Sequence, residues 1–365
     1  MKILILANND VGLYRFRREL IEVLLKENEI YIALPNGEFI GSLKKLGCKY
    51  INIAFDRRGL NPAKDFRLLL RYISIFKQEK PDVVLTYTIK PTIYGGIACR
   101  ITKTKYISNI TGLGTAVENP GLLRTLILKL YKVALKNVSC VFFQNQMNKE
   151  FFLNNKLFDG KTVLIPGSGV NTSEHYFEDY PAVERFHDNF LFVGRIMKDK
   201  GISELLDVIE RITSEYPGIT FDLIGGTDEN SYSERIEKLK RSGKLKYWGQ
   251  QSNVHEFYKR CNAVILPSYH EGMANVLLEA SSTGRPVLAS KISGCVEIFD
   301  EGVTGYGFEP KNSDSLYFTV KNFVGLSFEE KEKMGIAARQ KMIEYFDREI
   351  VIKAYRKEIE CLEDI

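Results

Sequence analysis

The chain has no apolar segment long enough to cross a bilayer, because charged residues interrupt every stretch before about 18 residues. Its six cysteines lie far apart and form no Cys-x-x-Cys pair, which argues against a disulfide framework and against the usual zinc spacing. The four histidines are equally scattered. We therefore expect reduced thiols, a cytoplasmic chain and no metal site.

The 365 residues are 44% apolar and 27% charged, a globular balance, and they suffice for two domains. The net charge of +5 is unevenly divided. Residues 1–168 contain 26 Lys and Arg against 13 Asp and Glu, whereas residues 169–365 contain 25 against 33. The basic first half predicts an anionic partner such as phosphate, nucleic acid or a membrane surface. Drift of surface charge is the alternative.

Short apolar runs alternate with helical periodicity along the whole chain, which is typical of parallel α/β sheets. The expected strands are 3–7, 30–34, 81–86, 106–110 and 139–143 in the first half, and 190–193, 220–224, 264–267 and 287–290 in the second. The polar stretch 174–188 between the halves is interpreted as a linker. We therefore predict an α/β protein with two Rossmann-like, doubly wound domains, over residues 1–170 and 185–346.

One loop at a predicted strand end is basic. It runs from Gly194 and Arg195, directly after a strand, to Lys200 and Gly201, directly before a helix. Two cations beside the free N–H groups of a helix N-terminus would bind a diphosphate. A solvated basic loop is the alternative.

A second loop holds Glu271 and, eight positions later, Glu279, with a helix expected to start near Asn275. Carboxylates accept hydrogen bonds from vicinal sugar hydroxyls. Two of them separated by a helix N-terminus could hold the two ends of a sugar nucleotide. In the alternative, Glu279 caps the helix or pairs locally and Glu271 is solvated.

Together these segments resemble the retaining GT-B glycosyltransferases of family 4, whose signature is two glutamates with seven residues between them. Here the motif runs from Glu271 to Glu279, and Gly284-Arg285-Pro286-Val287 follows it. The resemblance covers the second domain specifically and the first domain loosely. It implies the GT-B architecture, in which two Rossmann-like domains face a central cleft. The first would bind the acceptor and the second the nucleotide sugar.

The resemblance also implies roles for individual residues, with Arg195, Lys200 and Glu271 as the catalytic ones. Arg195 and Lys200 are expected to hold the donor diphosphate and to stabilise the leaving nucleotide. Glu271 would contact the donor hexose and Glu279 the ribose. The other donor-binding residues are expected to be Gly194, Gly249, Gly272, Met273, Ala274 and Asn275, with Gly249 in a loop that flanks the base, commonly uracil.

No Asp-x-Asp pair occurs in the chain. Glycosyltransferases of the other common fold use such a pair to hold a divalent metal on the diphosphate. Its absence agrees with Arg195 and Lys200 supplying the counter-charge. We therefore expect a metal-independent enzyme without a cofactor.

The acceptor side is expected in the first domain. Gly12 follows the first strand, as the family's glycine loop does. Thr111 and Gly112 follow another strand, where many relatives have a histidine. No histidine precedes residue 175, so Thr111 or Asn109 is the polar candidate. The Gly112-Leu113-Gly114 pattern resembles a subset that builds bacterial capsule, O-antigen and glycoprotein glycans on a polyprenyl diphosphate.

Three further features are a cluster of arginines and an amphipathic segment in the first domain, and the last segment of the chain. The cluster Arg15, Arg17 and Arg18 could hold an acceptor phosphate or form a solvated helix face. Residues 122–136 predict a helix with an apolar face and a lysine face, packed in the core or lying on a membrane surface. The striped segment 347–365 predicts a final helix. In similar GT-B proteins this helix returns to the first domain, so Tyr355 and Ile359 are expected to bury there.

The sequence thus predicts a retaining hexosyltransferase that moves a hexose or N-acetylhexosamine from a UDP-sugar to a lipid-linked or oligosaccharide acceptor. The enzyme would serve bacterial surface polysaccharide or glycan biosynthesis, peripherally on an anionic membrane at the cytoplasmic face of the inner membrane. One alternative is a sugar-nucleotide epimerase or hydrolase on a related fold. The other is a nucleic-acid-binding protein, but the chain lacks zinc-finger spacing and an aromatic RNP-like strand, so no nucleic acid is expected.

Overall fold

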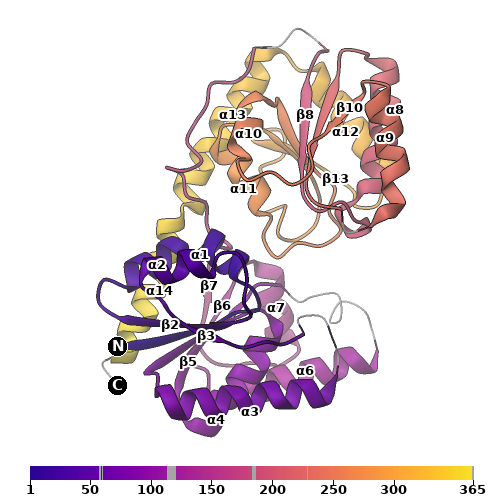
Figure 1. The fold of residues 1–365 in the computed structure, drawn as a ribbon. Helices are drawn as coiled ribbons and strands as arrows, with labels where there is room; N and C mark the ends of the chain where they lie inside the picture. The colour runs from indigo at the N-terminus through magenta and orange to yellow at the C-terminus, as the bar shows by residue number, and fades with distance from the viewer. Residues whose placement is uncertain (57–58, 60, 113–120, 183–185, 228, 364–365) are drawn as a thin grey trace. The chain divides into compact units, whose positions relative to one another are not determined.

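A computed structural model of the chain describes residues 1–56, 59, 61–112, 121–182, 186–227 and 229–363. The chain forms two compact units. Unit 1 comprises Met1–Ser168 and Glu349–Ile365, and unit 2 comprises Gly169–Arg348. Each unit contains one parallel sheet with helices on both faces (Figure 1). The predicted α/β class with two doubly wound sheets is confirmed.

Unit 1 contains a seven-stranded sheet whose central strands are buried on both faces, so they are continuous apolar runs. In sheet order the strands are β3 (Lys49–Asn52), β2 (Glu29–Leu34), β1 (Lys2–Leu6), β4 (Val83–Tyr87), β5 (Lys105–Ile110), β6 (Cys140–Phe143) and β7 (Thr162–Leu164).

Two helical layers cover this sheet (Figure 1). One layer consists of α1 (Asp10–Leu24), α2 (Ile40–Leu46) and α14 (Arg348–Glu363). The other consists of α3 (Pro62–Glu79), α4 (Gly96–Thr102), α6 (Leu122–Ala134) and α7 (Gln146–Asn154). Strand side chains alternate between them: Ile3 and Ile5 pack in the first layer, and Leu4 and Leu6 in the second.

The last helix, α14, belongs to unit 1 although the whole of unit 2 precedes it in the chain. Tyr355 is 1% exposed and stacks on Phe142 of β6, with ring centroids 4.3 Å apart. Ile359 is buried in the same cluster. Both residues therefore lie where the sequence predicts, against the sheet formed by the first 168 residues.

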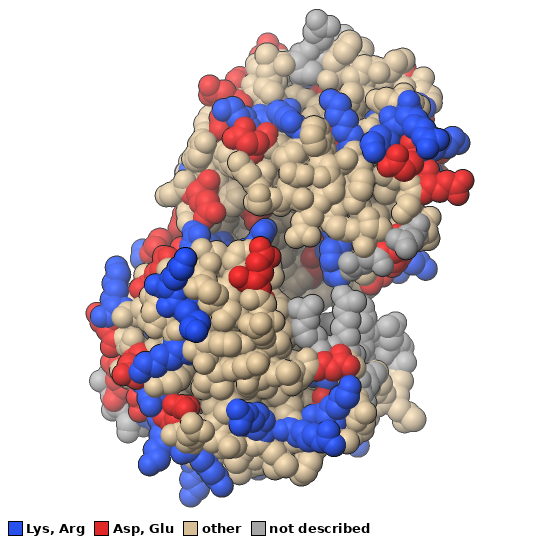
Figure 2. Space-filling view, viewed as in Figure 1, with Lys and Arg blue, Asp and Glu red and all other residues tan. Residues whose placement is uncertain are grey.

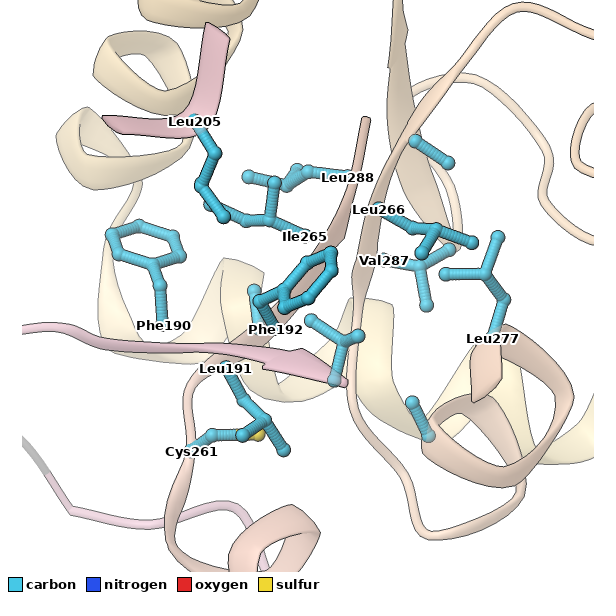
Figure 3. Packing of buried hydrophobic residues seen from close by; sticks show 14 of the residues in the cluster. Phe190, Leu191, Phe192, Leu205, Cys261, Ile265, Leu266, Leu277, Val287 and Leu288 are labelled. Atoms are coloured by element: carbon cyan, nitrogen blue, oxygen red, sulfur yellow. The ribbon is translucent and has the colours of Figure 1, made fainter. Parts of the chain in front are cut away.

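Unit 2 contains a six-stranded parallel sheet. In sheet order its strands are β10 (Leu245–Tyr247), β9 (Thr220–Ile224), β8 (Asn189–Val193), β11 (Ala263–Leu266), β12 (Val287–Ser290) and β13 (Gly305–Phe308). Its helices are α8 (Ile202–Glu215), α9 (Ser233–Arg241), α10 (His255–Arg260), α11 (Asn275–Ser282), α12 (Ser313–Gly325) and α13 (Phe328–Lys341). Phe190, Phe192 and Ile265 interdigitate with helix side chains such as Leu205 and Leu277 in one core (Figure 3).

The expected linker is packed rather than loose where the structure describes it. The buried guanidinium of Arg285 donates to the carbonyls of Glu178 and Asp179 at 3.0 and 2.8 Å. At the end of the segment, Asp188 is fully buried and accepts from Lys331 Nζ at 2.8 Å. Unit 2 therefore holds this segment through backbone carbonyls and one buried ion pair, neither of which its polar composition reveals.

Candidate active site

Three neighbouring strands of unit 2 end in glycine. Gly249 follows β10, Gly225 follows β9 and Gly194 follows β8, and the Gly225 N–H donates to the Gly249 carbonyl at 2.9 Å. A Cβ on Gly225 would lie 1.8 Å from the Gly194 oxygen, so no side chain fits between these backbones. The strand ends form a backbone floor that a flat ring or a phosphate can approach closely. Gly194 and Gly249 were predicted; Gly225 was not, although Gly225-Gly226 directly follows a predicted strand.

The basic loop lies after β8 on the same sheet edge. Arg195 is exposed, Lys200 is half-buried, and Gly201, with φ +67°, starts α8. A Cβ on Gly201 would lie 2.0 Å from the Pro267 carbonyl oxygen. The Asp199 carbonyl accepts from the Tyr269 N–H at 2.9 Å. The loop after β8 and the loop after β11 are therefore fixed to each other through their backbones.

Two of the predicted catalytic residues meet at this junction. Lys200 Nζ donates to Glu271 Oε1 at 2.5 Å, and both side chains are largely shielded from solvent, at 20% and 15% exposure. The predicted alternative, a solvated Glu271, does not hold. In this structure the carboxylate is the counter-ion of the lysine.

The segment from Gly272 to Asn275 leads into α11. Met273 and Ala274 are buried, and the Ala274 N–H donates to the Gly294 carbonyl at 2.8 Å. Ala274, the residue before α11, has no side chain that caps the helix. The first turn of α11, with its N-terminal dipole and the half-exposed Asn275, therefore follows Glu271 directly in the chain, after the short segment Gly272–Ala274.

Glu279 lies one turn into α11, as predicted. Its Oε2 accepts from the hydroxyl of Tyr258, on α10, at 2.8 Å. Burial, with the nearby Glu279 carboxylate, raises the pKa of the Tyr258 phenol well above its usual range, so Tyr258 remains a donor. Burial also lowers the pKa of the neighbouring His175 imidazole. The hydrogen bond from Tyr258 holds the Glu279 carboxylate in one orientation, which the binding of a ribose diol would need.

The loop beside Gly249 carries the chain's single tryptophan. Its indole Nε1 donates to Asp222 Oδ1 at 2.6 Å, and the Arg260 guanidinium lies 4.9 Å from its ring centroid. Trp248 is 39% exposed and is held at both its polar and its aromatic parts. Such a fixed, partly exposed ring next to a glycine floor suits the edge of a base.

The acceptor candidates of unit 1 are placed differently. Asn109 is 1% exposed, and its amide donates to the Tyr355 hydroxyl at 2.6 Å. Asn109 therefore makes an interior contact with α14 instead of lying on the acceptor side. Thr111 and Gly112 are half-buried at the end of β5, whereas Leu113 and Gly114 lie outside the described residues. Gly12 donates its N–H to Asn9 Oδ1 at 2.6 Å in the first turn of α1.

The arginine cluster on α1 is largely committed to contacts within unit 1. Arg17 is buried and lies 5.2 Å from the Tyr87 ring centroid, and Arg18 pairs with Glu19 at 3.5 Å. Exposed cations also lie elsewhere in this unit. Lys64, Arg67 and Arg71 of α3 line a pocket of about 360 Å³ whose other lining residues are Asn52, Ile53, Ala54, Phe55, Asp56, Asp65 and Leu68. The i, i+3, i+7 spacing of the three cations in the sequence is the signal that could have indicated this pocket.

The described residues contain no group of three His, Cys, Asp or Glu side chains that could hold a metal ion. Within the same ranges, no helix is long and apolar enough to span a membrane.

Comparisons with known proteins match both units of the chain. A family model described as Glycosyl transferases group 1 matches residues 185–341, and one described as Glycosyl transferase 4-like matches residues 2–145. The chain is 28% identical to the N,N'-diacetylbacillosaminyl-diphospho-undecaprenol alpha-1,3-N-acetylgalactosaminyltransferase of Campylobacter jejuni, with 98% of each covered. It is 25% identical to the capsular polysaccharide biosynthesis glycosyltransferase CapM of Staphylococcus aureus, over 91% of this chain and 90% of that one.

A crystal structure of an Anabaena protein in complex with UDP and glucose superimposes with a TM-score of 0.77 at 17% identity, covering 99% of this chain and 100% of the other. Likeness at this identity speaks for the fold alone. Together with the two family matches, it shows that the chain is a glycosyltransferase of group 1, family 4, with the GT-B fold.

Proposed function

We propose that this glycosyltransferase transfers a hexose or an N-acetylhexosamine, with retention, from a UDP-sugar to a glycan carried on a polyprenyl diphosphate. The product would enter a bacterial capsule or another surface glycan. The observation that carries the donor side is the Lys200–Glu271 pair, which joins the loop that follows Gly194 to the loop that leads into α11. The Campylobacter and Staphylococcus relatives support the acceptor class and the process through their names.

In this proposal the donor diphosphate replaces Glu271 as the counter-ion of Lys200. Phosphate oxygens carry more charge than one carboxylate, and they would also meet Arg195 and the α11 N-terminus. Glu271, released from the lysine, would accept a hydrogen bond from a hydroxyl of the donor hexose. Glu279, oriented by Tyr258, would bind the ribose hydroxyls, and Trp248 would flank the uracil.

Transfer would proceed on the front face of the sugar. The acceptor hydroxyl attacks the anomeric carbon as the bond to the β-phosphate breaks, and the departing phosphate takes the hydroxyl proton. Lys200 and Arg195 would stabilise the charge that develops on UDP, which is the largest catalytic contribution expected here. The cationic pocket on α3 is our candidate site for the acceptor diphosphate, because Lys64, Arg67 and Arg71 converge on it.

The test is transfer by the purified full-length protein from a panel of UDP-hexoses and UDP-N-acetylhexosamines to polyprenyl-diphosphate-linked acceptors. NMR of the product gives its anomeric configuration. We expect one donor to be preferred and its configuration to be kept. An inverted product would refute retention. Equal consumption of UDP-sugar with and without acceptor would indicate the epimerase or hydrolase alternative instead.

Metal dependence is a separate test of the same proposal. With two cations at the diphosphate, transfer should continue at an unchanged rate in EDTA. Loss of activity that Mg²⁺ or Mn²⁺ restores would show that Arg195 and Lys200 do not suffice.

A further inference from the structure

We propose that Tyr269, through a hydrogen bond to Glu204, is a positioning residue for the Lys200–Glu271 pair. Tyr269 lies in the loop after β11, two residues before Glu271. Glu204 lies in the first turn of α8, four residues after Lys200. The inference rests on the proposed function, because Tyr269 would act only through the roles proposed for Lys200 and Glu271.

The side chain of Tyr269 is enclosed at the junction of these two loops. It is 9% exposed, and its hydroxyl lies 2.7 Å from Glu204 Oε1 and 2.9 Å from Oε2. Burial, with the Glu204 carboxylate, raises the pKa of the Tyr269 phenol above its usual range, so the hydroxyl remains a donor. A hydrogen bond to an ionised carboxylate is about twice as strong as one between neutral groups. The bond is therefore a firm connection between the loop after β11 and α8.

This hydrogen bond complements the two backbone contacts at the same junction. The Tyr269 N–H donates to the Asp199 carbonyl at 2.9 Å, and Gly201 approaches the Pro267 carbonyl closely. Those contacts fix the residues on either side of Lys200, and the hydroxyl bond fixes the first turn of the helix that follows. A lysine side chain is a flexible stem, so its ammonium group is placed accurately only where its backbone is held.

Glu204 differs from other carboxylates of α8 in its partner. Asp207 and Glu210 pair with the guanidinium of Arg235, at 2.6 and 3.2 Å. Figure 2 shows Lys and Arg beside Asp and Glu over α8 and α9, as at an ordinary solvated surface. Glu204, in contrast, is half-buried and accepts from the uncharged phenol of Tyr269. The α8 dipole stabilises a carboxylate at this place, which makes it a strong acceptor.

The opposite end of α8 supplies an internal comparison. Tyr317 of α12 is 8% exposed, and its hydroxyl donates to Glu215, the last residue of α8. The donor type, the acceptor type, the burial and the helix are the same as for Tyr269 and Glu204. Glu204 is four residues from Lys200, whereas Glu215 is fifteen residues from it. A bond that merely stabilises α8 should have the same consequences at either end.

The experiment compares Tyr269→Phe with Tyr317→Phe in the full-length protein. Each variant loses one hydroxyl and should lower Tm by about 2–6 °C. With the UDP-sugar that the protein prefers, Tyr269→Phe should lower kcat by about tenfold, because a displaced Lys200 stabilises the leaving UDP less. Its Kd for UDP, measured by calorimetry, should change by less than about threefold. Tyr317→Phe should keep kcat within about twofold of the natural value.

Further variants separate positioning from a general loosening of unit 2. Glu204→Ala should lower kcat as much as Tyr269→Phe does. Glu204→Gln keeps an oxygen that can accept from Tyr269, and its kcat should lie within about threefold of the natural value. In a Lys200→Ala background, Tyr269→Phe should lower kcat by less than about twofold more, because the residue through which Tyr269 acts is absent.

Equal kcat values in Tyr269→Phe and Tyr317→Phe would overturn this inference alone, and so would an undiminished effect of Tyr269→Phe in the Lys200→Ala background. Near-normal kcat in Lys200→Ala itself would instead overturn the proposed function of the ion pair. Should Tyr269→Phe fail to fold, Glu204→Ala and Glu204→Gln make the same comparison. Equal kcat values in those two variants would then refute the positioning role.

Discussion

The strand ends of the two units are built in different ways. In unit 2 the loops after β8, β9 and β11 touch backbone to backbone, at contacts such as Gly201 against Pro267 and Gly225 against Gly194. In unit 1 side chains fix the corresponding places: Asn9 caps the turn at Gly12, and Asn109 binds Tyr355 of the distant helix α14.

Under the proposed function, in which unit 2 binds the donor and unit 1 the acceptor, the difference fits the two kinds of ligand. A nucleotide diphosphate is the same in every donor, and a backbone floor with a fixed lysine recognises it without adaptation. Glycan acceptors differ, and side-chain contacts can be exchanged one at a time without loss of the loop. In that proposal the donor site can be recognised as a sequence motif, whereas the acceptor site cannot. The predictions below test this contrast, from the largest expected effect to the smallest.

Removing the charge at the donor diphosphate should have the largest effect. Lys200→Ala and Arg195→Ala should each lower kcat by about 100-fold or more, because each removes about 3 kcal/mol of stabilisation from the leaving UDP. Steady-state kinetics with saturating donor measure this. Near-normal kcat in both variants would remove these residues from the reaction.

An added side chain should destabilise the protein more at a glycine that contacts backbone than at a glycine that contacts a side chain. Gly201→Ala should cost about 1–3 kcal/mol of stability, because φ is +67° and the new Cβ meets a carbonyl, and UDP binding should weaken as the loop moves. In Gly12→Ala the new Cβ would lie 3.0 Å from the Asn9 side chain, which can shift, so less than about 1 kcal/mol is expected. Thermal melts compare the two. Equal losses of stability in the two variants would show that the strand ends of the two units do not differ in this way.

The buried hydrogen bond between Asn109 and Tyr355 in unit 1 should affect the stability of the protein but not UDP binding. Tyr355→Phe removes the acceptor of the buried Asn109 amide and should cost about 1–3 kcal/mol. Urea unfolding gives the cost, and UDP titration should show an unchanged Kd. A weakened Kd would mean that α14 acts on the donor site.

The two glutamates should change UDP affinity in opposite directions. The sequence alone suggests that Glu271→Ala leaves UDP binding nearly unchanged, but the ion pair alters that expectation. Glu271→Gln frees Lys200 and should tighten UDP binding by about fivefold while impairing transfer, whereas Glu279→Gln should weaken it. Calorimetry on both variants decides. The exchange of counter-ions is refuted if Glu271→Gln binds UDP no more tightly than the natural protein does.

The sheets show where prediction from sequence succeeds and where it fails. The nine predicted strands all exist, within about two residues at each end. The four missed strands, β3, β7, β10 and β13, are the four edges of the two sheets. An edge strand pairs on one side only and is half-exposed, so segments such as Leu245–Tyr247 are too short and too polar to show an apolar run.

The candidate site follows the same logic. The meeting of Lys200 and Glu271 at one edge of the sheet could be predicted, because short loops at the ends of parallel strands lie there. The interior positions of Asn109 and Arg17 could not be predicted from the sequence, because α14 and the end of β5 are more than 200 residues apart in the chain. Local periodicity does not reveal which interior polar groups such a helix will satisfy.

The path of the chain between the units has a consequence for assembly of the protein. Val170 donates to the Phe346 carbonyl at 2.8 Å, and Arg348 donates to the Val170 carbonyl at 2.9 Å, so the outgoing and returning segments are hydrogen-bonded side by side. Topologically, unit 2 is a continuous insertion between β7 and α14. An insertion whose two ends already touch can be removed, replaced or expressed as residues 169–348 without reconnecting either sheet. If unit 2 binds the donor and unit 1 the acceptor, as proposed, a unit 2 for one donor could in this way replace that for another, with the hydrogen-bonded segments at Val170 and Phe346–Arg348 as the site of exchange.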